Sequence, residues 1–227
     1  MKLRWVYTFI ISVFFITARI SMASAPSTFV SLNDLCPSMI FQMSYATSEN
    51  FTGEVVTGYK SKIAYLAKGP ADALCLVQAD AQKIGLTIKI FDSYRPVKAV
   101  SFFQAWAQKP ETNPHVKQLY YPGFTRLELF EQGYIAKQSS HSRGSAVDLT
   151  LVVTKTGLSL DMGSAFDYFD NLSNTDSPKV TPDQKKNRQL LKQLMESRGF
   201  KNFSQEWWHY SFRLEPYPDQ YFDFDVE

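Results

Sequence analysis

The sequence predicts an α+β fold, with a single domain built on a central antiparallel or mixed sheet flanked by helices. The 227 residues are 44% hydrophobic and 20% charged, which is the composition of a globular chain with a packed core. Helical and strand-like segments alternate without a regular strand–helix–strand repeat, and this favours α+β over a parallel α/β sheet. No internal repeat or long linker divides the chain.

The first half of the fold is marked by periodicity and by glycine and proline. Apolar residues at helical spacing predict a helix over 70–84, which Gly85 ends. The β-branched run at 86–91 predicts a strand. Pro96 then opens a second helix. Because a residue before proline is pushed out of the helical region, Arg95 is expected in an extended corner that projects its side chain into a cleft.

The second half shows three further elements. A β-branched segment at 147–153 predicts a central strand, followed by a turn at 156–157. Residues 181–184 read Thr-Pro-Asp-Gln, a capping box with proline at the first helical position, and the helix that follows ends at Gly199. The aromatic segment 206–212 predicts the last strand.

The charge distribution argues against a nucleic-acid partner. The formal net charge is +2, but Lys2, Arg4 and Arg19 all lie in the first 25 residues, where no acidic residue occurs. The remainder is therefore close to neutral and contains no basic run. Such a surface supplies no field to hold a phosphate backbone.

The N-terminus has the three parts of a secretory signal. Its positive start is followed by an apolar stretch at 5–16 and by Ala-Ser-Ala at 23–25. We expect cleavage after Ala25, a mature domain of residues 26–227 and a periplasmic location without stable membrane association. An uncleaved anchor is disfavoured because the apolar run is shorter than the roughly 20 residues of a spanning helix.

Export places the two cysteines in an oxidising compartment. Cys36 and Cys75 could form one disulfide there, since two cysteines allow one pairing. A buried free thiol is the alternative, because cysteine is often simply a core residue. The sequence leaves this choice and the oligomeric state open.

The scarce histidines mark two dense polar motifs. His141 and Asp148 are seven residues apart across a glycine, and Glu206 precedes His209 by three. Residues three apart on a regular strand face opposite sides. A bend or bulge at 207–208 would therefore be needed to bring the second pair into one cleft.

These residues suggest a catalytic zinc site. His141, Asp148 and His209 would be ligands with one open position, Glu206 a general base beside the metal, and Arg95 an oxyanion stabiliser. The alternative is an ordinary set of turn caps, hydrogen bonds and salt bridges. Spacing alone does not decide, since the intervals match no generic zinc pattern.

Three ordered motifs resemble the zinc D-alanyl-D-alanine dipeptidases, the VanX type of D,D-peptidase. They are Ser-Tyr-Arg-Pro at 93–96, Ser-x-His-x-x-Gly-x-Ala-x-Asp at 139–148 and Glu-Trp-Trp-His at 206–209. The similarity extends over nearly the whole mature chain. It implies a hedgehog-like zinc D,D-peptidase fold.

The resemblance also implies a role for each site residue. One zinc per chain would be held by His141, Asp148 and His209, with Glu206 as base and acid and Arg95 as transition-state stabiliser. A small dipeptide would be gripped by Tyr45, Ser139 and Asp167, with Asp167 facing the substrate ammonium.

The expected activity is hydrolysis of D-alanyl-D-alanine in cell-wall dipeptide turnover. The signal sequence departs from resistance-type members, which act in the cytoplasm. A D,D-carboxypeptidase acting on longer wall peptides and a zinc-stabilised, non-catalytic peptidoglycan-binding module are the alternatives. The binding module has no evident need for both Glu206 and Arg95.

Overall fold

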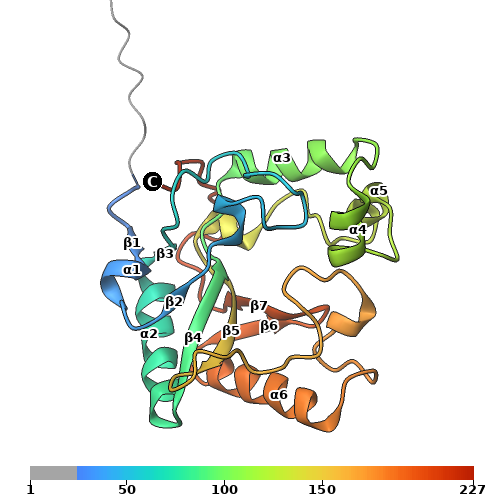
Figure 1. Ribbon diagram of the computed structural model, residues 1–227. Helices are drawn as coiled ribbons and strands as arrows, with labels where there is room; N and C mark the ends of the chain where they lie inside the picture. Colours follow the sequence, from blue (N-terminus) through green and yellow to red (C-terminus); the bar gives the residue numbers. More distant parts are fainter. Residues whose placement is uncertain (1–24) are drawn as a thin grey trace, which may run out of the picture.

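The computed structural model describes residues 25–227, with a five-stranded sheet at their centre (Figure 1). The strands are β1 (Phe29–Ser31), β2 (Ile40–Phe41), β3 (Tyr65–Ala67), β4 (Leu86–Asp92), β5 (Ala146–Val153), β6 (Phe200–Phe203) and β7 (Glu206–Phe212). The helices are α1 (Leu32–Leu35), α2 (Lys68–Lys83), α3 (Val97–Ala107), α4 (Pro114–Tyr120), α5 (Arg126–Glu131) and α6 (Pro182–Glu196), with 3-10 turns η1 (Ser44–Ala46), η2 (Ser140–Arg143) and η3 (Asn171–Ser173). The export signal expected over 1–25 lies, except for Ala25, outside the described residues.

The sheet is mixed, as the sequence predicts. Its order is β2-β4-β5-β7-β6, with a parallel pair only between β2 and β4. β5 is central and is buried on both faces along nearly its whole length, which confirms the strand predicted at 147–153. β1 and β3 form a separate antiparallel pair.

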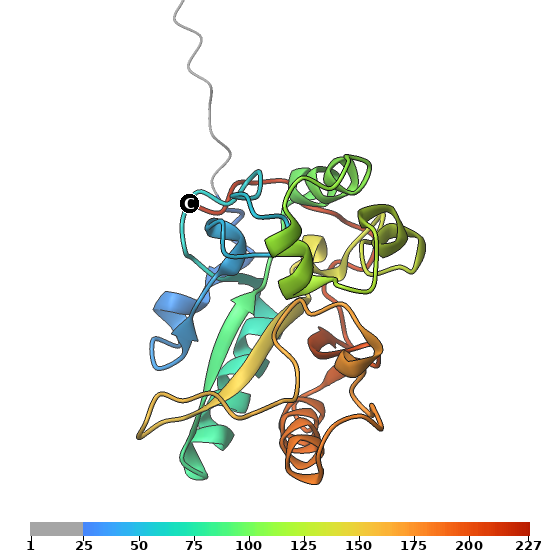
Figure 2. The same ribbon diagram turned by 45° about the vertical axis from the view of Figure 1, so that its right-hand side comes forward.

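The helices divide into two groups around this sheet (Figures 1 and 2). α2 and α6 contact each other and pack on β4 and β6, respectively. α3, α4 and α5 gather beyond the end at which β4 stops (Figure 1). Of this group, α3 contributes Val100 and Phe103 to the lining of the cavity described below.

The local signals in the sequence are confirmed. The helix predicted over 70–84 is α2, and the strand predicted over 86–91 is β4. Pro96 caps α3. The Thr181 Oγ1 atom accepts the backbone N–H of Gln184, while the Gln184 Oε1 atom accepts that of Thr181, so the capping box opens α6 as expected.

Two apolar clusters hold these layers together. One joins the sheet to α2 and α6, and the other is an aromatic cluster around α3 and the C-terminal segment. Cys36, at the end of α1, forms a disulfide with Cys75 of α2 across a Cα–Cα distance of 6.0 Å, which settles the choice that the sequence left open. Within residues 25–227, no helix is both long and apolar enough to cross a membrane.

Candidate active site

The polar side chains predicted for the site all line one cavity of about 190 Å³. They come from η1, the β4–α3 link, η2, β5, the 162–170 segment and β7. The set consists of Tyr45, Arg95, Ser139, His141, Asp148, Asp167, Glu206 and His209. Residues up to 164 positions apart in the sequence are therefore brought to one place.

The β5–β7 pairing and the turn before β5 assemble the histidine and aspartate side chains. Asp148 on β5 lies directly opposite His209 on β7. His141 sits in η2, which ends at Gly144 with φ +68°. This left-handed residue turns the chain into β5. A Cβ at Gly144 would overlap the Phe29 ring, so glycine is required for space as well as for conformation.

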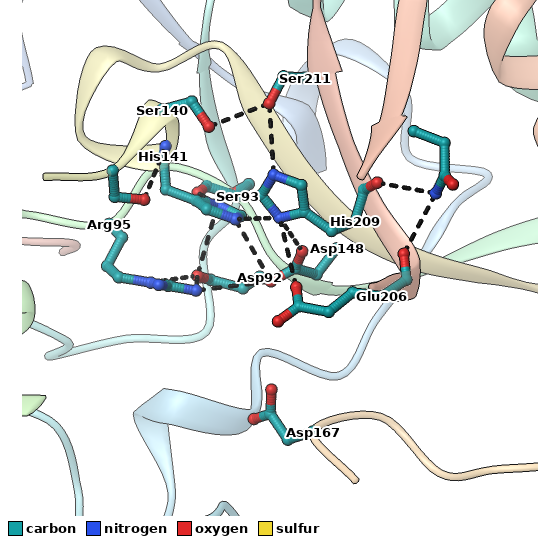
Figure 3. A network of polar contacts seen from close by, with 12 residues as sticks. Asp92, Ser93, Arg95, Ser140, His141, Asp148, Asp167, Glu206, His209 and Ser211 are labelled. Atoms are coloured by element: carbon teal, nitrogen blue, oxygen red, sulfur yellow. Dashed lines mark hydrogen bonds and ion pairs between the residues drawn. The ribbon is translucent and has the colours of Figure 1, made fainter. Parts of the chain in front are cut away.

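The three candidate ligand atoms converge. His141 Nε2 lies 3.2 Å from His209 Nδ1 and 3.4 Å from Asp148 Oδ2, and His209 Nδ1 lies 3.0 Å from Asp148 Oδ1 (Figure 3). A tetrahedral zinc ion with ligands at 2.0–2.1 Å spaces its ligand atoms by about 3.3 Å. Two imidazoles and one carboxylate at these separations therefore fit zinc, with a position left open for water or substrate.

The outward nitrogen of each imidazole has its own partner. His141 Nδ1 lies 2.5 Å from the Ser93 carbonyl oxygen, which can only accept, so this nitrogen carries the proton. His209 Nε2 lies 3.3 Å from Ser211 Oγ, which is 3.0 Å from Ser140 Oγ. Such outer contacts hold the protons on the outward nitrogens and leave the inward nitrogens free to bind a metal.

Glu206 reaches the same cavity because β7 is irregular. The β6–β7 register shifts between Asn202 and Phe203, so the bend predicted near 207–208 is present. Glu206 Oε2 lies 3.9 Å from His209 Nδ1. Burial, followed by the negative charge of Asp148, raises the pKa of Glu206 to about 8.

Asp92 is a site residue that the sequence reasoning missed. Its carboxylate is completely buried and accepts from Arg95 Nε at 2.9 Å and from Tyr59 Oη at 2.7 Å. Arg95 also lies 3.5 Å from Asp148 and stacks over the Tyr45 ring at 5.1 Å. The sequence signal that could have identified Asp92 is its position three residues before Arg95, next to Pro96. The Asp92 carboxylate fixes the Arg95 guanidinium at the cavity wall.

The carboxyl group of Asp167 faces the candidate metal ligands from the 162–170 segment (Figure 3). Asp167 is 3% exposed and accepts a hydrogen bond from Tyr45 Oη at 2.9 Å. Burial, and then the charge of Asp148, holds the pKa of Asp167 well above its usual range. A buried carboxylate with a perturbed pKa that lines a cavity is a candidate functional group.

Ser139 both caps a 3-10 turn and lines the cavity. Its Oγ atom accepts the backbone N–H of His141 at 3.2 Å and so caps η2. The same residue lines the cavity. A hydroxyl that accepts one hydrogen bond keeps its own proton free to donate.

Several proteins with similar sequences are D-alanyl-D-alanine dipeptidases. A family model described as D-ala-D-ala dipeptidase matches residues 26–227. The D-alanyl-D-alanine dipeptidase of Enterococcus faecalis is 42% identical over 87% of this chain and 98% of its own length, and that of Streptomyces coelicolor is 38% identical over 87% and 98%. The vancomycin resistance D,D-pentapeptidase VanY in complex with Zn(II) aligns with a TM-score of 0.40 and 14% identity, over 67% of this chain and 75% of that one. The family assignment therefore rests on the sequence relatives.

Proposed function

Because this chain belongs to the D-alanyl-D-alanine dipeptidase family of zinc metallopeptidases, we propose that it hydrolyses D-alanyl-D-alanine to two molecules of D-alanine. The family resemblance drawn from the three motifs is thereby confirmed. One observation carries the substrate assignment, namely the buried Asp167 carboxylate facing the Glu206 and His209 side chains across a cavity of about 190 Å³. A carboxylate at that point suits the free ammonium of a dipeptide.

We assign the proton transfers to Glu206. A zinc ion held by His141, Asp148 and His209 would polarise the scissile carbonyl and acidify the attacking water. Glu206 takes the proton of that water and returns it to the leaving amine. Its carboxylate lines the cavity and lies 3.9 Å from His209 Nδ1, within reach of a water at the open metal position.

We assign the developing negative charge to Arg95. Its guanidinium is fixed by Asp92 at 2.9 Å on one side and by ring contacts with Tyr45 and Phe103 at 5.1 and 5.3 Å on the other. The side chain is only 15% exposed. A fixed cation in such a site stabilises an oxyanion without reorganising during the reaction.

The substrate is held at its charged end by Tyr45 and Asp167, and Ser139 supplies a donor. Tyr45 Oη already donates to Asp167, which orients the carboxylate before substrate binds. A longer wall peptide has no free ammonium at this position and would bring an uncharged amide to a buried carboxylate. Selection of a dipeptide follows from that mismatch.

The test is D-alanine release by the purified mature chain, residues 26–227. D-alanyl-D-alanine and a wall pentapeptide ending in the same pair would be compared, with the Glu206→Gln variant as the control for contaminating activity. We expect cleavage of the dipeptide and little of the pentapeptide. Preference for the pentapeptide would make the protein a D,D-carboxypeptidase, and cleavage of neither by zinc-loaded protein would make it a binding module.

We also propose one zinc ion per chain. The three converging donor atoms supply one site of the right composition, and metal analysis of the purified chain should give one equivalent of zinc. A His141→Ala variant should lose it, because one ligand is removed. A wild-type stoichiometry near zero or two would contradict the proposal.

We propose that the chain acts in the periplasm on dipeptides released from the cell wall. The Cys36–Cys75 disulfide supports this, since such bonds persist in oxidising compartments. Fractionation should recover a soluble periplasmic protein that begins after Ala25, with a cytoplasmic enzyme as the marker for leakage. Recovery from the cytoplasm with residues 1–25 intact would refute it.

A further inference from the structure

β7 leaves the regular ladder at the segment that carries the assigned base. β6 pairs Asn202 with Tyr210 and its next residue, Phe203, with Glu206. The β7 residues 207–209 therefore have no partner on β6. Extra residues in one strand bend it and disrupt the ladder hydrogen bonds nearby. The bend turns the base and the ligand that follows it toward one cavity.

The side-chain amide of Asn202 bridges this bulge. Its Nδ2 atom donates to the backbone carbonyl oxygen of Glu206 at 3.1 Å and to that of His209 at 3.1 Å. These are the two ends of the irregular segment. One planar amide thus sets the separation between the backbone of the base and the backbone of the metal ligand.

Thr175 fixes the orientation of that amide. Thr175 is 1% exposed, and its hydroxyl donates to Asn202 Oδ1 at 2.6 Å. The backbone N–H of Thr175 donates to the Ser204 carbonyl oxygen at 2.9 Å, in the β6–β7 turn. The reversed amide would place Oδ1 against two carbonyl oxygens that cannot donate, so Nδ2 must face the bulge.

We infer that Asn202 is a positioning residue for the reaction, acting through the backbone carbonyls of Glu206 and His209. Asn202 is not among the residues that line the cavity, so it does not touch the substrate. The inference rests on the proposed function for the step that is positioned. It goes beyond that function by placing the control of base and ligand geometry in an uncharged side chain outside the cavity.

The test replaces the bridging amide and measures three quantities. Asn202→Asp has nearly the same shape but puts a carboxylate oxygen against both carbonyl oxygens. We expect kcat for D-alanyl-D-alanine to fall about 10- to 100-fold and the affinity for Zn²⁺, measured by competition with a chelator, to fall about 10-fold. KM should change by less than about threefold because Tyr45 and Asp167 are untouched.

Asn33→Asp is the matched control. Asn33 is also half-buried, accepts the Ala64 N–H at 2.9 Å and donates to the Lys62 carbonyl oxygen at 3.5 Å, away from the cavity. If Asn202 only supports the fold, both variants should lower the melting temperature without changing kcat or zinc affinity in the folded protein. That result would overturn the inference.

A second pair of variants keeps the test decisive if Asn202→Asp does not fold. Thr175→Val removes the hydroxyl that orients the amide, whereas Thr175→Ser retains it. We expect Thr175→Val to lower kcat and zinc affinity and Thr175→Ser to preserve both; equal behaviour of the two would refute the inference. Zinc affinity needs no substrate, so a wild-type chain that fails to cleave the dipeptide would refute the proposed function without deciding the role of Asn202.

Discussion

Asp167→Asn should make the protein more stable and less active at once. Asp167 is 3% exposed, and burial followed by the charge of Asp148 raises its pKa well above the usual range. The folded state therefore favours the protonated form more than the unfolded state does. Ionisation at neutral pH costs folding free energy, and an amide of the same shape removes that cost. Asparagine also tolerates the φ of 59° at this position, and its Oδ1 still accepts from Tyr45.

The sign of the effect depends on pH in a defined way. Below the unfolded-state pKa of about 3.9 both states are protonated, so the variant gains nothing. Above it the gain grows by up to about 1.4 kcal/mol per pH unit until the folded-state pKa is passed. We expect Asp167→Asn to exceed the wild type by at least about 1 kcal/mol in unfolding free energy at pH 7.

The activity change has the opposite sign. Losing the Asp167 charge opposite a buried substrate ammonium should cost about 3 kcal/mol, or roughly a 10²-fold fall in kcat/KM. Urea unfolding from pH 4 to pH 8 and dipeptide kinetics measure the two effects. Asp170→Asn is the control, since Asp170 caps η3 outside the cavity lining. A gain that does not vary with pH would refute the electrostatic reasoning, and unchanged kcat/KM would refute the ammonium role.

Three further substitutions test the site and its supports. Glu206→Gln should lower kcat by about 10³-fold while zinc content stays at the wild-type value; near-normal turnover would show that another group is the base. Arg188→Met removes a completely buried guanidinium that donates to three backbone carbonyls in the 162–174 segment, and urea unfolding should show a loss of about 3 kcal/mol. Gly144→Ala should cost about 2–4 kcal/mol in the same assay, because its Cβ would overlap the Phe29 ring at a positive φ; a loss below about 1 kcal/mol would contradict that overlap.

Local chemistry in the sequence predicted the main elements of the fold. The capping box before α6, the glycine after α2 and the proline before α3 act through neighbouring residues. Their effects can be read without knowing the tertiary structure. The short strands β1, β2, β3 and β6 were not predicted, since segments of two to four residues carry too little periodicity and form only when a partner strand is present.

The candidate site also has a part that the sequence predicted and a part that it did not. The three motifs supplied the candidate ligands His141, Asp148 and His209, because the side-chain types that zinc chemistry needs are visible in the sequence, and the fold brings these side chains together. The motifs did not reveal that Asp92 holds Arg95, or that Tyr45 reaches Asp167 across 122 positions. These pairs depend on long-range packing that brings separate segments together.

The sequence by itself determined the family, the order of the main elements and the residue types available for catalysis. Only the tertiary structure decided how Glu206 and His209, on opposite faces of any regular strand, come to share one cavity. The reason is the bulge at 207–209, which exists only because β7 pairs with β5 on one side and is bridged by Asn202 of β6 on the other. The three-residue spacing alone would place the two side chains on opposite faces of the strand. The contacts of β7 with β5 and β6 bring them to one side.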